Sequence, residues 1–380
     1  MSTTSWPVCP PAHTVEPCDC NTTSGHFVCG KSISYPLDLK YIFQESSRHL
    51  KQENPKLKNT NIIYHKFIFQ NSILDHLESN FLDTFAFREV QIDHNDYLQT
   101  IGINSFISTY NTTDRVLFES NPSIGLKTTE VINFFNVLSQ FRNASHIQVI
   151  DCGLTFIPDN AFRPLNGVQT RLQRVSFAKN RITTVGDFSF SNLPNIEFLS
   201  FHKNLIHNFS KLSLVFSNSS DHLLLDVSKN LLTYSSFDSE ALLSIRRPFD
   251  LQLSDNLITH LNETIFKPLF KNSIFIKLWR NPINCSDCRM KWTSNEKLCG
   301  LSNNTISYSQ RIEFQCKLFK DNFRRCQNDT YAGAEELLEN TLPCPLISGS
   351  TIVQKCNTFI ILSSILTLSL FHFNLKIGLL

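Results

Sequence analysis

The stretch LQRVSFAKNRI, residues 172–182, contains the spacing that decides the fold. Its apolar residues at 172, 175, 177 and 182 surround an asparagine at 180, which fits neither strict alternation nor a helical period. Four later stretches share this frame: IEFLSFHKNLI (196–206), HLLLDVSKNLL (222–232), PFDLQLSDNLI (248–258) and SIFIKLWRNPI (273–283). Their asparagines follow one another at intervals of 24, 26, 26 and 25 residues, at Asn180, Asn204, Asn230, Asn256 and Asn281, so the chain contains a repeat.

The frame continues less regularly upstream. SHIQVIDCGL (145–154) has Cys152 in the asparagine position, and earlier stretches offer Asn121, Asn95 and Ser72. The shared frame is the leucine-rich repeat pattern, in which a short parallel strand points alternate side chains into a common core. We therefore predict an α/β solenoid, a leucine-rich repeat horseshoe with a parallel concave sheet, with about nine repeats over residues 31–283. Cys152 is interpreted as a member of the asparagine ladder rather than as a nucleophile.

Cysteines gather at the two ends of the chain, as expected for caps that cover the open ends of a solenoid. The spacing C-x8-C-x-C-x8-C predicts an N-terminal cap over 9–30 with two disulfides. NPINC, at 281–285, opens a predicted C-terminal cap over 284–346, whose pairing stays open. Structural disulfides are favoured over zinc or thiol redox chemistry at the C-x-x-C of 285–288. The predicted disulfide cysteines are Cys9, Cys18, Cys20, Cys29, Cys285, Cys288, Cys299, Cys316, Cys326 and Cys344.

Nine Asn-x-Ser/Thr sequons accompany these cysteines, and together they favour passage through the secretory pathway. We expect glycans at Asn21, Asn111, Asn143, Asn208, Asn218, Asn262, Asn303 and Asn328; the ninth sequon is at Asn284. The start, MSTTSWPVCPP, has neither the basic nor the apolar region of a signal peptide. We expect that the sequence begins downstream of its true start.

Residues 347–380 are interpreted as a tail that attaches the chain to a membrane. An apolar run covers 358–373, and the small residues Ser348, Gly349 and Ser350 precede it by a mostly polar spacer. This order is typical of a glycolipid anchor signal, although a short membrane span stays an alternative. The protein is thus expected outside the cell, either secreted or held at the outer surface.

The succession of cap, repeats and cap over 9–344 resembles the extracellular leucine-rich repeat proteins. More narrowly, CPPAHTVEPCDC (9–20), the irregular early repeats and the final NPINC opening resemble certain arthropod secreted proteins. Those proteins are labelled oplophorus-luciferin 2-monooxygenase non-catalytic subunit. This resemblance implies a binding or stabilising partner without chemistry of its own.

No motif for catalysis or for a cofactor is found in the sequence. Phosphate-binding glycine loops, the nucleophile elbow and the zinc-protease helix motif are all absent, so we expect no enzyme activity and no cofactor. His202 and His207 flank Asn204 and are interpreted as surface residues rather than metal ligands. A net charge of +2 without a basic tract argues against nucleic acid as a partner.

The concave sheet is the predicted binding surface. Because strand side chains alternate, residues six, four and two positions before each ladder residue should face solvent. Aromatic residues among charges at these positions resemble interface anchors, although Phe198 could bend into the repeat edge and Trp279 could pack under the cap. We predict non-enzymatic extracellular protein binding, in recognition or adhesion; the alternative is a secreted non-catalytic subunit that stabilises a partner enzyme. The predicted site residues are Arg174, Phe198, His202, Asp226, Asp250, Gln252, Phe275, Lys277 and Trp279.

Overall fold

The fold was analysed in a computed structural model, which describes residues 6–30, 38–58, 60–163, 169–219, 221–271, 275–278, 280–284, 287 and 289. The chain divides into two compact units, and the described residues up to Pro282 all belong to the first. Trp279, the six cysteines predicted for the C-terminal cap, Asn303, Asn328 and the tail over 347–380 lie outside the described residues. Within the described part, no helix is both long enough and apolar enough to cross a membrane.

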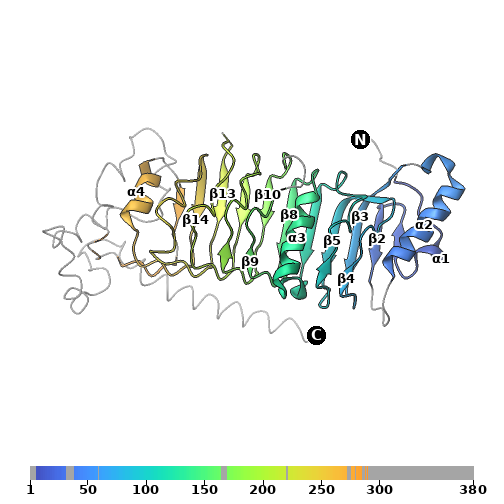
Figure 1. Ribbon diagram of the computed structural model, residues 1–380, viewed down its shortest axis with the longest axis horizontal. Coiled ribbons are helices and arrows are strands. Elements are labelled where there is room, and N and C mark those ends of the chain that lie inside the picture. Colours follow the sequence, from blue (N-terminus) through green and yellow to red (C-terminus); the bar gives the residue numbers. More distant parts are fainter. Residues whose placement is uncertain are drawn as a thin grey trace, which may run out of the picture. The chain divides into compact units, whose positions relative to one another are not determined.

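One eleven-stranded sheet runs through this unit (Figure 1). Its first two strands pair antiparallel and every later neighbour is parallel, as the repeat predicts. In spatial order the strands are β1 (Asp19–Asn21), β2 (His26–Cys29), β3 (Ile62–Gln70), β5 (Phe85–Asp93), β7 (Arg115–Glu119), β8 (His146–Ile150), β10 (Arg174–Ser176), β12 (Phe198–Ser200), β13 (Leu223–Asp226), β14 (Phe249–Gln252) and β15 (Phe275–Lys277).

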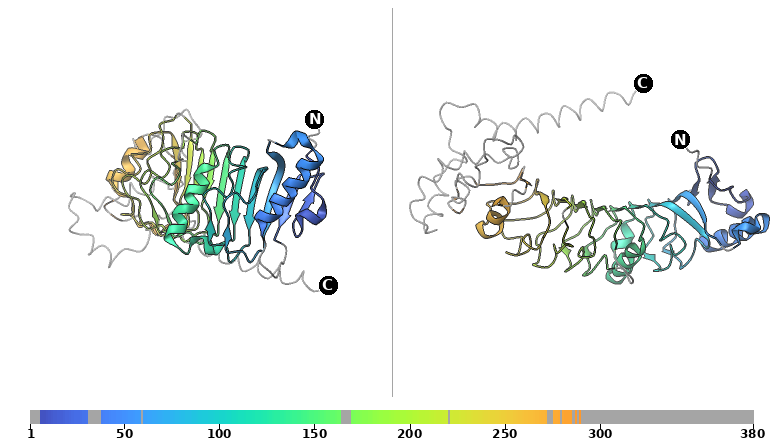
Figure 2. Two further views of the ribbon diagram at one scale, coloured as in Figure 1. Left: turned by 45° about the vertical axis from the view of Figure 1, so that its right-hand side comes forward. Right: turned by 90° about the horizontal axis from the view of Figure 1, so that it is seen from above.

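The remaining elements are short, apart from two helices. Two small parallel sheets pair β4 (His76–Leu77) with β6 (Thr100–Ile101) and β9 (Phe156–Ile157) with β11 (Thr184–Val185). The helices are α1 (Ala12–Val15), α2 (Leu39–Glu53), α3 (Thr128–Gln140) and α4 (Glu263–Lys271), with 3₁₀ turns η1 (Pro55–Leu57) and η2 (Pro122–Gly125). Helix α3 lies against the core side of the sheet (Figure 2), where Phe134 contacts Phe118 and Phe135 contacts Phe177.

A ladder of buried asparagine side chains joins neighbouring repeats. Asn180 Oδ1 accepts hydrogen bonds from the backbone N–H of Cys152 at 2.9 Å and of Leu154 at 3.2 Å. Its Nδ2 donates to the carbonyls of Val149 and Phe177. The same kind of bonding recurs at Asn204, Asn230, Asn256 and Asn281. The ladder predicted from the sequence is therefore confirmed, and its side chains satisfy backbone groups that would otherwise be buried unpaired.

Cys152 occupies the ladder position of its repeat. Its side chain is fully buried, and its Sγ donates to the carbonyl of Ile150 at 3.4 Å. Burial raises the pKa of this thiol to about 12, so it remains protonated at neutral pH. This confirms the interpretation as a ladder residue, because a nucleophilic cysteine needs its thiolate.

Phenylalanines fill much of the core, and this role explains part of their abundance in the sequence. Phe190 lies between Phe162, to which it is tilted, and Phe216, on which it stacks, with ring centroids 5.9 Å apart in both pairs. Phe177 stacks on Phe201 at the same separation. These rings come from equivalent positions of successive repeats, so each fills the space between its neighbours. Each aromatic pair adds roughly 0.5–1.5 kcal/mol beyond its buried area.

Two disulfides hold the N-terminal cap, as predicted. Cys9, which precedes α1, is joined to Cys20 on β1, and Cys18, just before β1, is joined to Cys29 on β2. Strand β2 then pairs parallel with β3, which makes the cap continuous with the repeat sheet. Phe27 on β2 is fully buried and contacts Tyr64 and Phe85. The cap therefore covers the first core layer with aromatic side chains.

Candidate functional site

The parallel register places equivalent side chains of successive strands in lateral rows on the solvent side of the sheet, here called the sheet face. Buried residues alternate with the row members along most strands, as a half-buried sheet requires, although the small row members Ser176 and Ser200 are themselves buried. The first row consists of His26, Lys66, Glu89, Arg115, His146, Arg174, Phe198, Leu224 and Asp250, and the backbone of Phe275 is next in register. The second row consists of Val28, Ile68, Gln91, Leu117, Gln148, Ser176, Ser200, Asp226, Gln252 and Lys277.

Arg174 and Phe198 are neighbours in the first row and form one contact. The guanidinium carbon of Arg174 lies 4.5 Å from the centroid of the Phe198 ring. Arg174 is exposed and Phe198 is half-buried, so the ring is neither turned into the repeat edge nor fully open. Such a cation over an aromatic face holds both side chains in place and adds roughly 0.5–1 kcal/mol at an exposed site.

Ser228 connects His202 and Asp226 by hydrogen bonds. Ser228 Oγ donates to Asp226 Oδ1 at 2.5 Å, and His202 Nδ1 lies 2.8 Å from the same Oγ. Since the serine has one proton and gives it to the carboxylate, His202 donates to it through Nδ1–H. In a catalytic triad the histidine stands between serine and aspartate and accepts the serine proton. The order here is different, so this network positions His202 rather than activating a nucleophile.

The other predicted residues follow toward β15. Asp250 Oδ2 lies 3.3 Å from Nε2 of His222, the residue directly before β13. Gln252 and Lys277 are half-buried and adjacent in the second row. The backbone of Phe275 aligns with Asp250 in the first row. The structure thus brings together every predicted site residue that it describes, within two rows and the turn that follows them.

The first row also contains charged residues that were not predicted, on the strands nearer the N-terminus. Lys66 Nζ and Arg115 Nη1 lie 3.8 Å and 3.9 Å from the carboxylate of Glu89. The pKa of His146 is lowered, first by burial and then by the cations Arg115 and Arg174. The signal was present in the sequence: Lys66, Glu89, Arg115 and His146 stand six positions before the ladder residues Ser72, Asn95, Asn121 and Cys152.

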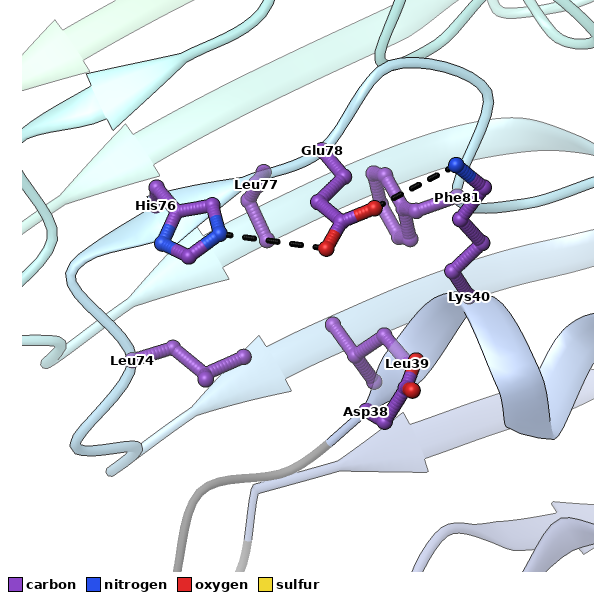
Figure 3. A pocket seen from close by; sticks show the side chains of 8 residues that line it. All are labelled: Asp38, Leu39, Lys40, Leu74, His76, Leu77, Glu78 and Phe81. Carbon is purple, nitrogen blue, oxygen red and sulfur yellow. Dashed lines mark hydrogen bonds and ion pairs between the residues drawn. The ribbon is translucent and has the colours of Figure 1, made fainter.

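A small pocket lies away from the sheet face, between the start of α2 and the segment around β4 (Figure 3). Its cavity volume is about 220 Å³, and Leu39, Leu77 and Phe81 contribute its apolar lining. Glu78 pairs with Lys40 at 3.3 Å and approaches His76 at 3.9 Å, so these three side chains face one another across the pocket (Figure 3). The described residues contain no group of three or more histidine, cysteine or acidic side chains that could hold a metal ion.

The fold and its ladder define a leucine-rich repeat protein. No family model matches the chain, and no curated protein matches it either. Among solved structures it is similar to human 5T4 (Wnt-activated inhibitory factor 1, trophoblast glycoprotein). The TM-score is 0.42 and the identity 12%, over 70% of this chain and 88% of that one. It is also similar to a chain of the Drosophila Toll–Spatzle complex, with a TM-score of 0.32 and 12% identity over 67% of this chain and 43% of that one. The resemblance to the arthropod subunits finds no support in these comparisons and stays a prediction.

Proposed function

We propose that this chain is a non-enzymatic, extracellular protein-binding module that recognises its partner through the sheet face. One observation supports this most: a continuous surface of registered rows in which a half-buried aromatic ring, Phe198, is held among ordered charged groups. Ordered aromatic and arginine side chains are the usual anchors of protein interfaces, because ordering them on binding costs little entropy. Ten parallel strands at about 4.8 Å give a face roughly 40 Å long, enough for a standard interface.

The extracellular setting is supported by the two disulfides of the N-terminal cap, since such bonds persist in oxidising compartments. Of the predicted glycan sites, Asn21, Asn111, Asn208 and Asn218 are exposed, while Asn143 and Asn262 are half-buried. We expect a mass shift at these asparagines after enzymatic release of glycans from the secreted protein. Release from cells by a phospholipase that cuts glycolipid anchors would support the anchored form, and constitutive secretion would support the soluble form.

A pair of charge exchanges tests the sheet face. In the first variant, Arg174→Glu and Asp250→Lys reverse two face charges while the net charge is unchanged. In the matched control, Lys211→Glu and Glu240→Lys reverse an exposed ion pair of 2.7 Å away from the face. Crosslinking capture with the secreted full chain should lose its partner in the first variant and keep it in the control. A partner kept by both variants would refute the sheet face as the binding surface, and copurification with a catalytic chain would identify the subunit alternative.

A further inference from the structure

In four successive repeats, the turn that follows the strand presents one residue on each side of the buried ladder asparagine, and all eight are exposed except the half-buried Asp255. We call this set the ladder rim: Lys179, Arg181, Lys203, Leu205, Lys229, Leu231, Asp255 and Leu257. It lies beyond the rows of the sheet face, and none of the functions discussed so far involves it.

The three lysines of the rim adopt an unfavourable backbone conformation. Their φ angles are 59°, 59° and 54° at Lys179, Lys203 and Lys229. Other repeats place Asn71, His94, Asp151 and Asp255 at this position, and also Ser120 and Arg280. Asparagine, aspartate and histidine tolerate the left-handed region better than lysine does. Lysine therefore stands in three consecutive repeats against local conformational preference.

The same lysines are held close to one another with like charge. Backbone bonds link the turns, from Lys179 N to the carbonyl of His202 at 2.8 Å and from Lys203 N to that of Ser228 at 3.0 Å. Successive rim residues are thus about one strand spacing, roughly 5 Å, apart. All three side chains are exposed, and among the described residues no carboxylate forms an ion pair with any of them. Asp151 and Asp255 stand at the same position in the two flanking repeats, so the three lysines form a bounded cationic stretch that a ligand with negative charge would stabilise.

Leucines form the second part of the rim. Leu205, Leu231 and Leu257 are 42%, 42% and 49% exposed. Backbone hydrogen bonds to the preceding repeat also hold these leucines in line. Leu205 N donates to Ile182 O and Leu231 N donates to Ile206 O, each at 2.9 Å. Only the buried asparagine separates Lys203 from Leu205 and Lys229 from Leu231. A stripe of exposed apolar side chains therefore runs beside the stripe of cations.

We propose that the ladder rim is a second binding surface, which takes an acidic amphipathic helix of a partner protein. Its carboxylates would face the lysines and its apolar side chains would cover the leucines. Side chains at i and i+4 of a helix are roughly 5–6 Å apart, close to the spacing of successive turns. A sulfated glycan would satisfy the charges but leave the leucines uncovered. An anionic bilayer favours side chains that protrude, whereas these leucines are half covered by their own surface.

The test uses the full glycosylated chain and a synthetic helical peptide with adjacent stripes of glutamate and leucine. The first variant combines Lys179→Asn, Lys203→Asn and Lys229→Asn, because asparagine suits a positive φ. The control combines Lys56→Gln, Lys58→Gln and Lys127→Gln, which removes the same charge from other exposed positions. Glutamine is used here because asparagine at 58 or 127 would create a new Asn-x-Thr glycan site. We expect the rim variant to bind the peptide about tenfold more weakly, as the loss of three exposed charge contacts predicts, while the control binds normally. The rim variant should unfold at the same temperature as the wild type or higher.

Three results would overturn the proposal: equal weakening in both triple variants, equal binding of a peptide with lysine in place of glutamate, or binding of heparin or phosphatidylserine vesicles without binding of the peptide. A second variant, Leu205→Gln with Leu231→Gln and Leu257→Gln, should also weaken peptide binding. Asn208, three residues after Leu205, is a predicted glycan site. If the peptide binds only after Asn208→Gln, the glycan covers the rim and the proposal fails. The sheet-face exchange of Arg174 and Asp250 should leave peptide binding unchanged, so the two surfaces are tested separately.

Discussion

Replacing Asn204 with alanine removes three buried hydrogen bonds at once. Its Oδ1 accepts from Ile182 N at 3.0 Å, and its Nδ2 donates to the carbonyls of Phe177 at 2.8 Å and Phe201 at 2.9 Å. The side chain is 5% exposed, so water cannot easily take its place. Each buried group left unpaired costs roughly 1–3 kcal/mol. Partial relaxation of the turn reduces the sum, and we expect the free energy of unfolding to fall by about 3–4 kcal/mol.

Cysteine at the same position makes a graded control, because the ladder already accepts cysteine at 152. The Sγ of Cys152 donates to one carbonyl, at 3.4 Å. Asn204→Cys should therefore restore one weak donor and recover about 1 kcal/mol relative to alanine. The measurement is urea denaturation followed by circular dichroism, with hydrogen exchange at the Ile182 amide reporting the local turn. A loss below about 1 kcal/mol in Asn204→Ala, or no faster exchange at Ile182, would refute the view that these bonds hold neighbouring repeats together.

The remaining predictions concern the cysteines and histidines. Cys152 should react with iodoacetamide at pH 8 at least 100-fold more slowly in the folded chain than in urea, because burial keeps its thiol protonated; comparable rates would contradict this. Removing the Cys18–Cys29 disulfide by paired serine substitution should destabilise the cap by about 2–4 kcal/mol, seen as a lower unfolding temperature. Burial and neighbouring cations lower the pKa of His26 and His146 below the ordinary histidine value of 6.5. Below pH 6.5 the unfolded chain therefore binds more protons than the folded chain, so the free energy of unfolding should decline as the pH falls. The double variant His26→Gln, His146→Gln should show a smaller decline.

The repeat frame was sufficient to predict the parallel strands and their register. Because Arg174 and Phe198 both stand six positions before a ladder asparagine, their alignment follows from counting. The cation over the ring does not follow from counting, because it depends on side-chain rotamers. The contacts of Ser228 with His202 and Asp226 also depend on side-chain rotamers, so the sequence does not predict them.

The early repeats were harder to interpret. Helix α3 was not predicted, although the distance from Asn121 to Cys152 is 31 residues and exceeds every interval among the regular repeats. Helix α2 was also missed, despite the apolar series Leu39, Ile42, Phe43 and Leu50 on one face. Both helices lie where the asparagine spacing is irregular. One fixed repeat period therefore does not predict these two helices, although the local apolar pattern of α2 indicates a helix.

The antiparallel strand β1 has a consequence for how this molecule can change over evolutionary time. A solenoid of parallel strands can lengthen by duplication of one repeat, since each new strand contacts only its two neighbours. Addition before β1 is different, because that strand runs the other way and is fixed to β2 by Cys18–Cys29 and to the preceding segment by Cys9–Cys20. New repeats can enter on the C-terminal side of the cap without disturbing it. The first row should therefore lengthen by duplication of members that follow the cap, while its first member, His26 on β2, keeps its place at the end of the row.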